Sequence, residues 1–212
     1  MSRFLVFEGL DGSGKSSLMQ AFESELNRRQ IAFRHTREPG GTILGQSLRP
    51  LILRKDIPAP VPRAELLMYE ADRAQHVAEV IRPSLKSGAW VLSDRYAASS
   101  IAFQAGGREI SEADVLWLNR FATGDLQPDL TVLLDLSVEQ ARSRRAGRNA
   151  SAGETEDRME SEADAFHIRV RNSFLAQAAA QPDRWLVLSA AEPPEKLLSL
   201  LLAETRRRQW LA

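Results

Sequence analysis

The chain has 212 residues, of which 43% are hydrophobic and 26% charged, a composition typical of a globular protein with a core of its own. Lys and Arg together number 28, as do Asp and Glu, so the formal net charge is zero. This balance argues against a nucleic-acid-binding protein that depends on overall positive charge. The sequence contains no cysteine, which excludes disulfides and thiolate metal sites.

The first residues lead directly into an apolar run rather than a signal peptide, and no apolar run is long enough to span a bilayer. We therefore expect a cytoplasmic protein that binds neither membranes nor nucleic acid. The length predicts a single domain over residues 1–212.

Short apolar runs alternate with helical patterns along the whole chain. Runs that are apolar on both faces are typical of strands in a parallel sheet covered by helices. The predicted strands are Phe4–Phe7, Ile31–His35, Trp90–Ser93, Leu130–Leu136 and Trp185–Leu188. Apolar residues recur at helical spacing in Glu65–Ile81 and from Phe166 to Ala178. The alternation predicts a three-layer α/β fold, a five-stranded parallel sheet flanked by helices, with ligands at the carboxyl ends of the strands.

A glycine-rich segment, Gly9–Ser16, follows the first predicted strand and reads G-x-x-x-x-G-K-S. A predicted helix, Ser16–Arg28, follows it, and this context distinguishes a phosphate-binding loop (P-loop) from a chance match. Glycines let successive N–H groups converge on an anion, Lys15 would reach the β- and γ-phosphates, and the Ser16 hydroxyl would bind Mg²⁺. The segment predicts a nucleoside triphosphate site with phosphate contacts from Gly9, Leu10, Asp11, Gly12, Ser13, Gly14, Lys15, Ser16 and Ser17.

Two further groups could hold a second ligand. Arg37 and the turn that follows it, Glu38–Thr42, end the second strand, and Arg37 could bind a phosphate. A plain turn beside a solvated arginine is the alternative. Tyr69 and Arg73 share one face of a predicted helix, where an aromatic ring and a guanidinium could stack on a base and bond its edge. A tyrosine at the edge of the core beside an extended arginine explains this pair equally well.

Asp94 and Arg95 close the third predicted strand. In a P-loop protein, an aspartate at this position favours a Mg²⁺-associated carboxylate, bound directly or through water. The neighbouring guanidinium offers a planar fork for a second phosphate. An ordinary local ion pair is the alternative.

The segment Gly147–Asp157 contains no large apolar residue and two glycines, which predicts a mobile loop. Mobile arginines that close over a transferring phosphoryl group are a recurrent solution to the charge that develops there. We therefore predict a lid over about residues 142–158; a basic, solvated helix face is the alternative. The predicted lid carries Arg142, Arg144, Arg145 and Arg148 near its start.

Five stretches, taken in this order, resemble the bacterial thymidylate kinases, which are nucleoside-monophosphate kinases of the P-loop class. They are Phe7–Ser16, Thr36–Thr42, Ala71–His76, Asp94–Gln104 and Pro128–Leu136. The resemblance implies transfer of the γ-phosphoryl group of MgATP to dTMP, giving dTDP and ADP. It also implies a homodimer formed through helices beside the sheet.

The same resemblance implies roles for single residues. Asp11 would orient the acceptor near its sugar and phosphate, and Arg37 and Arg95 would hold the acceptor phosphate. Asp94 would support the metal ion or its waters. The base pocket would consist of Tyr69 stacked on thymine, Arg73 at the base edge, and Ser100, Phe103 and Gln104.

The family divides by whether its catalytic arginine lies in the P-loop or in the lid. Here the loop carries Asp11-Gly12-Ser13 and no basic residue at these positions, whereas the predicted lid is rich in arginine, so the chain looks like the lid-arginine type. Arg144 and Arg148 match the pattern best, and Arg158 belongs to an Asp-Arg-x-Glu stretch that follows. The implied catalytic residues are Lys15, Asp94, Arg95, Arg144 and Arg148.

Two departures from the family leave the substrate open. Tyr69 stands where phenylalanine is usual, and Phe103 stands where tyrosine is common, so a hydroxyl group moves within the pocket. A kinase for another nucleoside monophosphate, or for a deoxynucleoside, is the first alternative. A P-loop regulatory ATPase that needs no acceptor pocket is the second.

Overall fold

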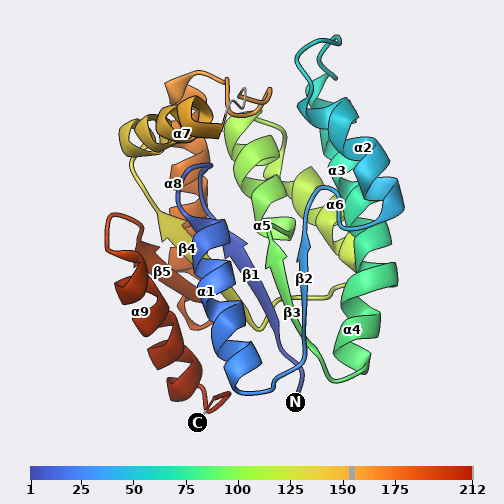
Figure 1. Cartoon of the computed structure of the whole chain (residues 1–212). Helices are drawn as coiled ribbons and strands as arrows, with labels where there is room; N and C mark the ends of the chain where they lie inside the picture. Colours follow the sequence, from blue (N-terminus) through green and yellow to red (C-terminus); the bar gives the residue numbers. More distant parts are fainter. Residues whose placement is uncertain (153–155, 212) are drawn as a thin grey trace.

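Strands of one parallel sheet form the centre of the molecule, in the order β2-β3-β1-β4-β5 (Figure 1). The computed structural model describes residues 1–152 and 156–211, and for residues 148–152 it describes only the backbone. The strands are β1 (Phe4–Glu8), β2 (Phe33–Arg37), β3 (Trp90–Asp94), β4 (Leu130–Asp135) and β5 (Trp185–Ser189). All five predicted strands are confirmed, with small shifts at their ends.

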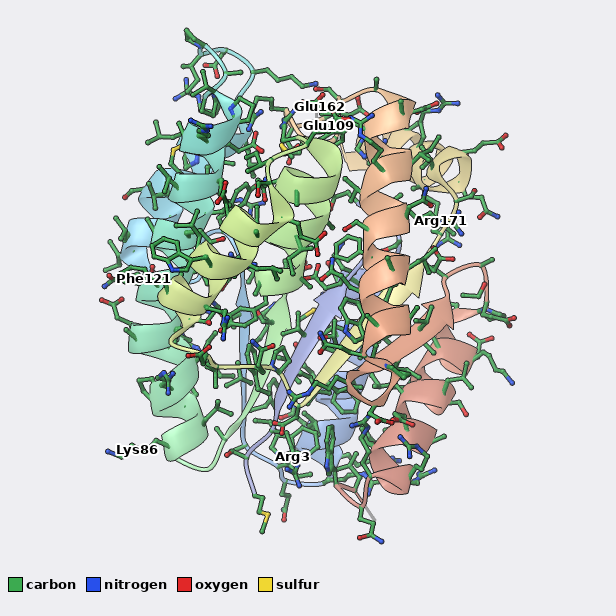
Figure 2. All side chains as sticks on the ribbon, turned by 180° about the vertical axis from the view of Figure 1, so that it is seen from behind. Arg3, Lys86, Glu109, Phe121, Glu162 and Arg171 are labelled. Carbon is green, nitrogen blue, oxygen red and sulfur yellow. The ribbon has the colours of Figure 1, made fainter. Side chains whose placement is uncertain are left out.

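Helices cover both faces of the sheet (Figures 1 and 2). On one face lie α1 (Lys15–Arg28) and α9 (Pro194–Arg207), which contact each other. On the other face lie α8 (Asp164–Ala180) and a helical segment made of α5 (Ala97–Ser100) and the π-helical turn η2 (Ile101–Gly107). The three-layer α/β prediction is therefore confirmed.

Helix α1 packs on the sheet through an apolar stripe. Leu18, Phe22 and Leu26 are buried at intervals of four residues, which places them on one face of the helix. The helix begins directly after Gly14, whose positive φ of 94° is readily adopted only by glycine. The turn before the helix and the stripe within it together anchor the P-loop against β1.

The remaining helical elements are distributed around the sheet (Figure 1). They are α2 (Ile43–Leu53), α3 (Pro62–His76), η1 (Val77–Ile81), α4 (Arg82–Lys86), α6 (Glu112–Thr123), α7 (Val138–Ala152) and η3 (Pro182–Arg184). The predicted helix over 65–81 is confirmed, because α3 continues without a break through the π-helical turn η1 into α4. No helix within the described ranges is long and apolar enough to cross a membrane.

One prediction of local structure is wrong in part. The predicted loop 147–157 begins inside α7, whose backbone stays helical to Ala152. Residues 153–155 lie outside the described residues. Ala146, Ala150 and Ala152 favour a helix by propensity alone. Over residues 147–152 the lack of large apolar residues therefore does not distinguish a helix from a loop.

The register of the sheet brings distant residues to one edge. Arg37 at the end of β2 is paired with Asp94 at the end of β3, and Asp94 is paired with Phe7 of β1. The P-loop, the turn after Arg37 and the Asp94–Arg95 pair consequently lie side by side at the carboxyl ends of three adjacent strands.

Candidate functional site

The P-loop lies between β1 and α1 and depends on glycine at its first position. Gly9 has a φ of 137°, and a Cβ atom there would lie 2.5 Å from the backbone oxygen of Leu134. Only glycine fits such a position without moving β4. The side chain of Lys15 is buried, and its Nζ donates hydrogen bonds to the backbone oxygens of Gly9 at 3.1 Å and Leu10 at 3.3 Å. The ammonium group is therefore held in the loop by its own backbone.

A cavity of about 690 Å³ opens above the loop at the carboxyl ends of the strands. It brings together most of the predicted site, namely Asp11, Gly12, Gly14, Lys15, Ser16, Ser17, Arg37, Tyr69, Arg73, Asp94, Arg95, Ser100, Phe103, Gln104 and Arg144. Gly9, Leu10 and Ser13 belong to the same loop but do not line the cavity. The side chain of Arg148 lies outside the described residues.

Arg95 lines the cavity next to the P-loop residue Asp11. Its φ of 72° is unusual for a residue with a side chain, and such conformations are concentrated at functional sites. Its Nη2 donates to Asp11 Oδ1 at 2.7 Å, and its Nη1 lies 3.7 Å from Glu8 Oε2. The guanidinium also stands over the ring of Phe103, 4.9 Å from its centroid. Arg95 is thus held between two carboxyl groups and an aromatic ring, facing the cavity.

The pKa values of the two carboxyl groups beside Arg95, Glu8 and Asp11, shift in opposite directions. Burial raises the pKa of Glu8 to about 7, although Arg95 and Lys15 oppose the shift. Burial also acts to raise the pKa of Asp11, but Arg95 and Lys15 outweigh it and hold that pKa well below its usual range. Asp11 is therefore a permanent carboxylate, whereas Glu8 is a buried carboxyl that changes charge near neutral pH.

Arg73 is only 1% exposed and belongs to a buried polar network. Its Nε donates to Glu38 Oε2 at 2.8 Å, and its Nη1 donates to Glu70, Ser100 and Asn119. An extended, solvated arginine is therefore excluded. The guanidinium forms part of the cavity wall, and its orientation is set by two carboxylates.

Tyr69 lies one helical turn before Arg73 and lines the same cavity. Its ring is half-buried, and burial followed by the nearby Glu65 raises the pKa of its hydroxyl above the usual range. The aromatic plane and the guanidinium are thus brought together as their spacing on the helix predicts.

Three of the arginines before the predicted loop can be placed. Arg144 lines the cavity, and its Nη2 donates to the backbone oxygen of Ala190 at 2.9 Å. Arg145 is 2% exposed, and its Nη1 donates to the backbone oxygen of Asp11 at 3.3 Å. Arg142 points instead to Asp164 of α8. A uniformly solvated basic face is therefore excluded.

Several residues of the cavity wall were not among the predicted site residues. They are Glu38, Pro39, Arg49, Leu53, Ser99, Asp157, Met159 and Glu160. Arg49 reaches the wall from α2, where its Nη1 donates to the backbone oxygen of Pro39 at 2.9 Å, and no spacing in the sequence marks it. For Asp157, Met159 and Glu160 the Asp-Arg-x-Glu stretch was a signal. Its place in the cavity depends on Arg158, which bonds Glu65 and the backbone of Ile52.

Comparisons of the sequence with known proteins point to the same family as the motifs that form this cavity. The sequence profile of thymidylate kinase matches residues 7–200. A thymidylate kinase of Bdellovibrio bacteriovorus is 63% identical over 209 residues, covering 99% of this chain and 98% of the relative. A thymidylate kinase of Desulfovibrio desulfuricans is 44% identical over 211 residues, covering 97% of each chain. One of Nitratidesulfovibrio vulgaris is 44% identical over 197 residues, covering 92% and 88%. The match covers nearly the full length of the chain, and the P-loop and Arg95 lie in one cavity. The chain therefore belongs to the thymidylate kinase family.

Proposed function

We propose that the chain transfers the γ-phosphoryl group of ATP to dTMP, giving dTDP and ADP. The observation that carries the proposal is one cavity that contains both the P-loop and an acceptor region with Arg95, Tyr69 and Gln104. A regulatory ATPase would need the first part and not the second. The names of the relatives support the same reaction.

The chemistry asks for neutralisation of charge and alignment rather than for a strong base. A phosphate monoester has a second pKa near 6, so the acceptor is largely dianionic at neutral pH. The obstacle is to bring two polyanions together, and positioned cations remove it. In this proposal Lys15 binds and neutralises the donor phosphates. Arg37, Arg49 and Arg95 do the same for the acceptor phosphate. Asp11, an ionised neighbour of Arg95, would orient the acceptor through its sugar.

We infer that Mg²⁺ accompanies ATP at Ser16 and Asp94. Both residues line the cavity, and Asp94 Oδ1 is buried without a hydrogen-bond partner among the described residues. The described part of the chain has no group of three or more His, Cys, Asp or Glu side chains arranged to hold a metal. This donor set suits Mg²⁺, which keeps several waters and phosphate ligands. When bound, the ion would neutralise charge on the transferring group.

We propose that arginines of α7 complete the site. Arg144 lines the cavity, and Arg148 follows about one helical turn later. If Arg148 acts on the transition state, Arg148→Ala lowers kcat more than it raises the KM for dTMP. The reverse pattern in steady-state kinetics would make Arg148 a binding residue.

We propose a homodimer formed through α3 and α6, which contact each other. Large apolar side chains are exposed on these helices: Leu67 is 55% exposed, Trp117 64% and Phe121 77%. The rings of Trp117 and Phe121 stack with centroids 5.8 Å apart, and Figure 2 shows Phe121 at the surface of this side of the molecule. A contiguous exposed apolar patch is typical of an interface. Sedimentation should give twice the mass of the chain, and Phe121→Asp should reduce it to that of a monomer.

The direct test is ADP release with MgATP and a panel of dTMP, dUMP, UMP, CMP, AMP and GMP, with thymidine as a nucleoside acceptor. Strong preference for dTMP supports the proposal. Preference for another acceptor makes the chain a kinase for that nucleotide or nucleoside. Turnover that needs no acceptor supports the regulatory ATPase. A cytoplasmic location is part of the proposal.

A further inference from the structure

The amide of Gln104 is held on one side by a buried carboxylate. Gln104 is 1% exposed and lines the cavity, and its Nε2 donates to Glu65 Oε1 at 2.8 Å. Within the described ranges this is the one hydrogen bond recorded for its side chain. The partner of the amide therefore decides which end of the amide faces the cavity.

Glu65 is 0% exposed and lies between two guanidinium groups. Its oxygens accept from Arg108 Nε at 3.2 Å, from Arg108 Nη2 at 3.1 Å and from Arg158 Nη2 at 2.7 Å. The Glu65 oxygens thus face donors from two arginines, and a carboxylate offers only acceptors. The group of Gln104 that faces it must be the NH₂ group. The carbonyl oxygen of Gln104 is consequently left as the polar group for a ligand.

Arg73 supplies the opposite kind of group nearby. Ser100, one helical turn before Gln104, accepts from Arg73 Nη1 at 2.8 Å. Arg73 has no acceptor atom, and its Nη2 makes one recorded bond within the described chain, to the backbone oxygen of Tyr96 at 3.2 Å. One Nη2 hydrogen is therefore left to donate. The base end of the cavity presents a donor from Arg73 and an acceptor from Gln104.

This pair matches one class of pyrimidine edge. Thymine and uracil carry an imide, with an N3–H donor beside a carbonyl acceptor. Cytosine carries the inverse pattern, with an N3 acceptor beside an amino donor. If the Gln104 carbonyl oxygen faces N3, it accepts a hydrogen bond from the N3–H group of thymine or uracil. With cytosine the same oxygen faces the N3 lone pair, and two acceptors repel each other. A buried mismatch of this kind discriminates strongly, because both partners lose their hydrogen bonds.

We propose that Glu65 is a positioning residue for base specificity: it fixes the amide of Gln104 so that the site accepts imide pyrimidines and rejects cytosine. This proposal rests on the proposed phosphorylation of dTMP. Glu65 does not itself line the cavity and acts only through Gln104. A merely structural Glu65 would hold Arg158 and Arg108 without any effect on the choice of base.

The variant Glu65→Gln separates the two roles. A glutamine at this position can donate or accept, so the Gln104 amide can turn round. We expect the ratio of kcat/KM for dTMP to that for dCMP to be about a thousandfold in the wild type and to fall by at least about tenfold in the variant. A Glu65→Gln enzyme that loses activity with both substrates but keeps the wild-type ratio would overturn the proposal.

Glu162→Gln is the matched control. Glu162, labelled in Figure 2, pairs with Arg108 at 2.6 Å and therefore belongs to the same ionic network without touching Gln104. Its variant should keep the dTMP to dCMP ratio within about twofold. An equal fall of the ratio in both variants would mean that charge in the network, and not the orientation of the amide, sets specificity, and would also overturn the proposal.

Two further measurements keep the test decisive. If Glu65→Gln does not fold, the double variant Glu65→Gln/Arg108→Met removes one charge of each sign, and the same ratio is measured with it. In the wild type, methylation of dTMP at N3 removes the donor and should lower kcat/KM by at least about a hundredfold. A wild type that uses neither dTMP nor dUMP refutes the proposed function itself. A wild type that uses dTMP and dCMP equally refutes only the role of Glu65.

Discussion

The two ends of the cavity are built in different ways. The phosphate end is built around one uninterrupted stretch, Gly9–Ser17, whose conformation depends on glycines and on backbone contacts. The base end is assembled from residues far apart in the chain, such as Glu38 and Arg73, which are 35 positions apart, and Glu65 and Arg158, which are 93 positions apart. A phosphate is a compact anion that a loop of N–H groups can bind. A base needs directional partners on several sides, which only a tertiary arrangement supplies.

The largest effect is expected at the phosphate end. Lys15→Ala removes the buried ammonium that the loop holds, and the donor phosphates lose their nearest fixed cation. We expect kcat/KM to fall by roughly 10⁴-fold, about 5 kcal/mol of transition-state stabilisation, with little change in the unfolding temperature. Steady-state kinetics and thermal unfolding measure the two quantities. Near-normal turnover in the folded variant would show that the P-loop is not the donor site.

At the base end the larger effect should be on folding. Arg73→Met leaves the buried carboxylates of Glu38 and Glu70 without their shared cation, which costs roughly 3–5 kcal/mol in the free energy of unfolding. Urea unfolding measures the cost. Arg73→Lys, which keeps the charge but not the fork, should lose less stability. If both variants were as stable as the wild type, the network would not hold this end of the cavity together.

The loop end can also be destabilised, but through its backbone. Gly9→Ala combines an unfavourable φ with the close approach of Leu134, and should cost roughly 3 kcal/mol. Gly88→Ala is its matched control, because Gly88 has a φ of 89° but no atom within 4 Å of the added Cβ. The control should cost only about 1 kcal/mol. Equal costs in urea unfolding would show that the contact with β4 is not what requires glycine.

The smallest expected effect is on stability and concerns Glu8, the buried carboxyl group beside Arg95. Burial raises the pKa of Glu8 from 4.5 to about 7, so in this range the folded protein holds a proton that the unfolded chain has lost. The stability that Glu8 contributes is therefore present below about pH 4.5 and is lost as the pH rises through about 7. Glu8→Gln removes this dependence. Between about pH 5 and about pH 8 the variant should gain roughly 2 kcal/mol relative to the wild type.

Glu8→Gln needs no separate control, because each protein is compared with itself at two pH values. A difference between variant and wild type that stays constant across this range would show that Glu8 does not titrate there in the folded state.

Much of the phosphate end could be read from the sequence. The P-loop, the strands and helix that flank it, and the Asp94–Arg95 pair are contiguous signals, and all line or support the cavity. The resemblance to thymidylate kinases was confirmed by a profile match over residues 7–200. The roles assigned to single residues remain predictions for the experiments above.

The error at the start of the predicted loop has a simple cause. A helix without apolar residues and a loop without apolar residues share a composition, and propensity alone separates them. The backbone of α7 stays helical to Ala152, where a loop was expected from Gly147 onward. The sequence assigns Arg145 no role of its own among the four lid arginines, yet it is buried against the P-loop. Its neighbour in sequence, Arg144, turns toward the cavity instead.

The sequence by itself determined the features that depend on neighbours along the chain. These are the anion-binding loop, the alternation of strands and helices along the chain, and the motifs that identify the family. Only the tertiary structure decided which other side chains line the cavity or support its wall, because Arg49, Glu65 and the segment 157–160 come from separate elements. The tertiary structure also decided the charge of the buried carboxyl groups. The ionisation of Glu8 and Asp11 follows from how far each is removed from water and how close Arg95 lies to each, and neither quantity can be read from the order of residues.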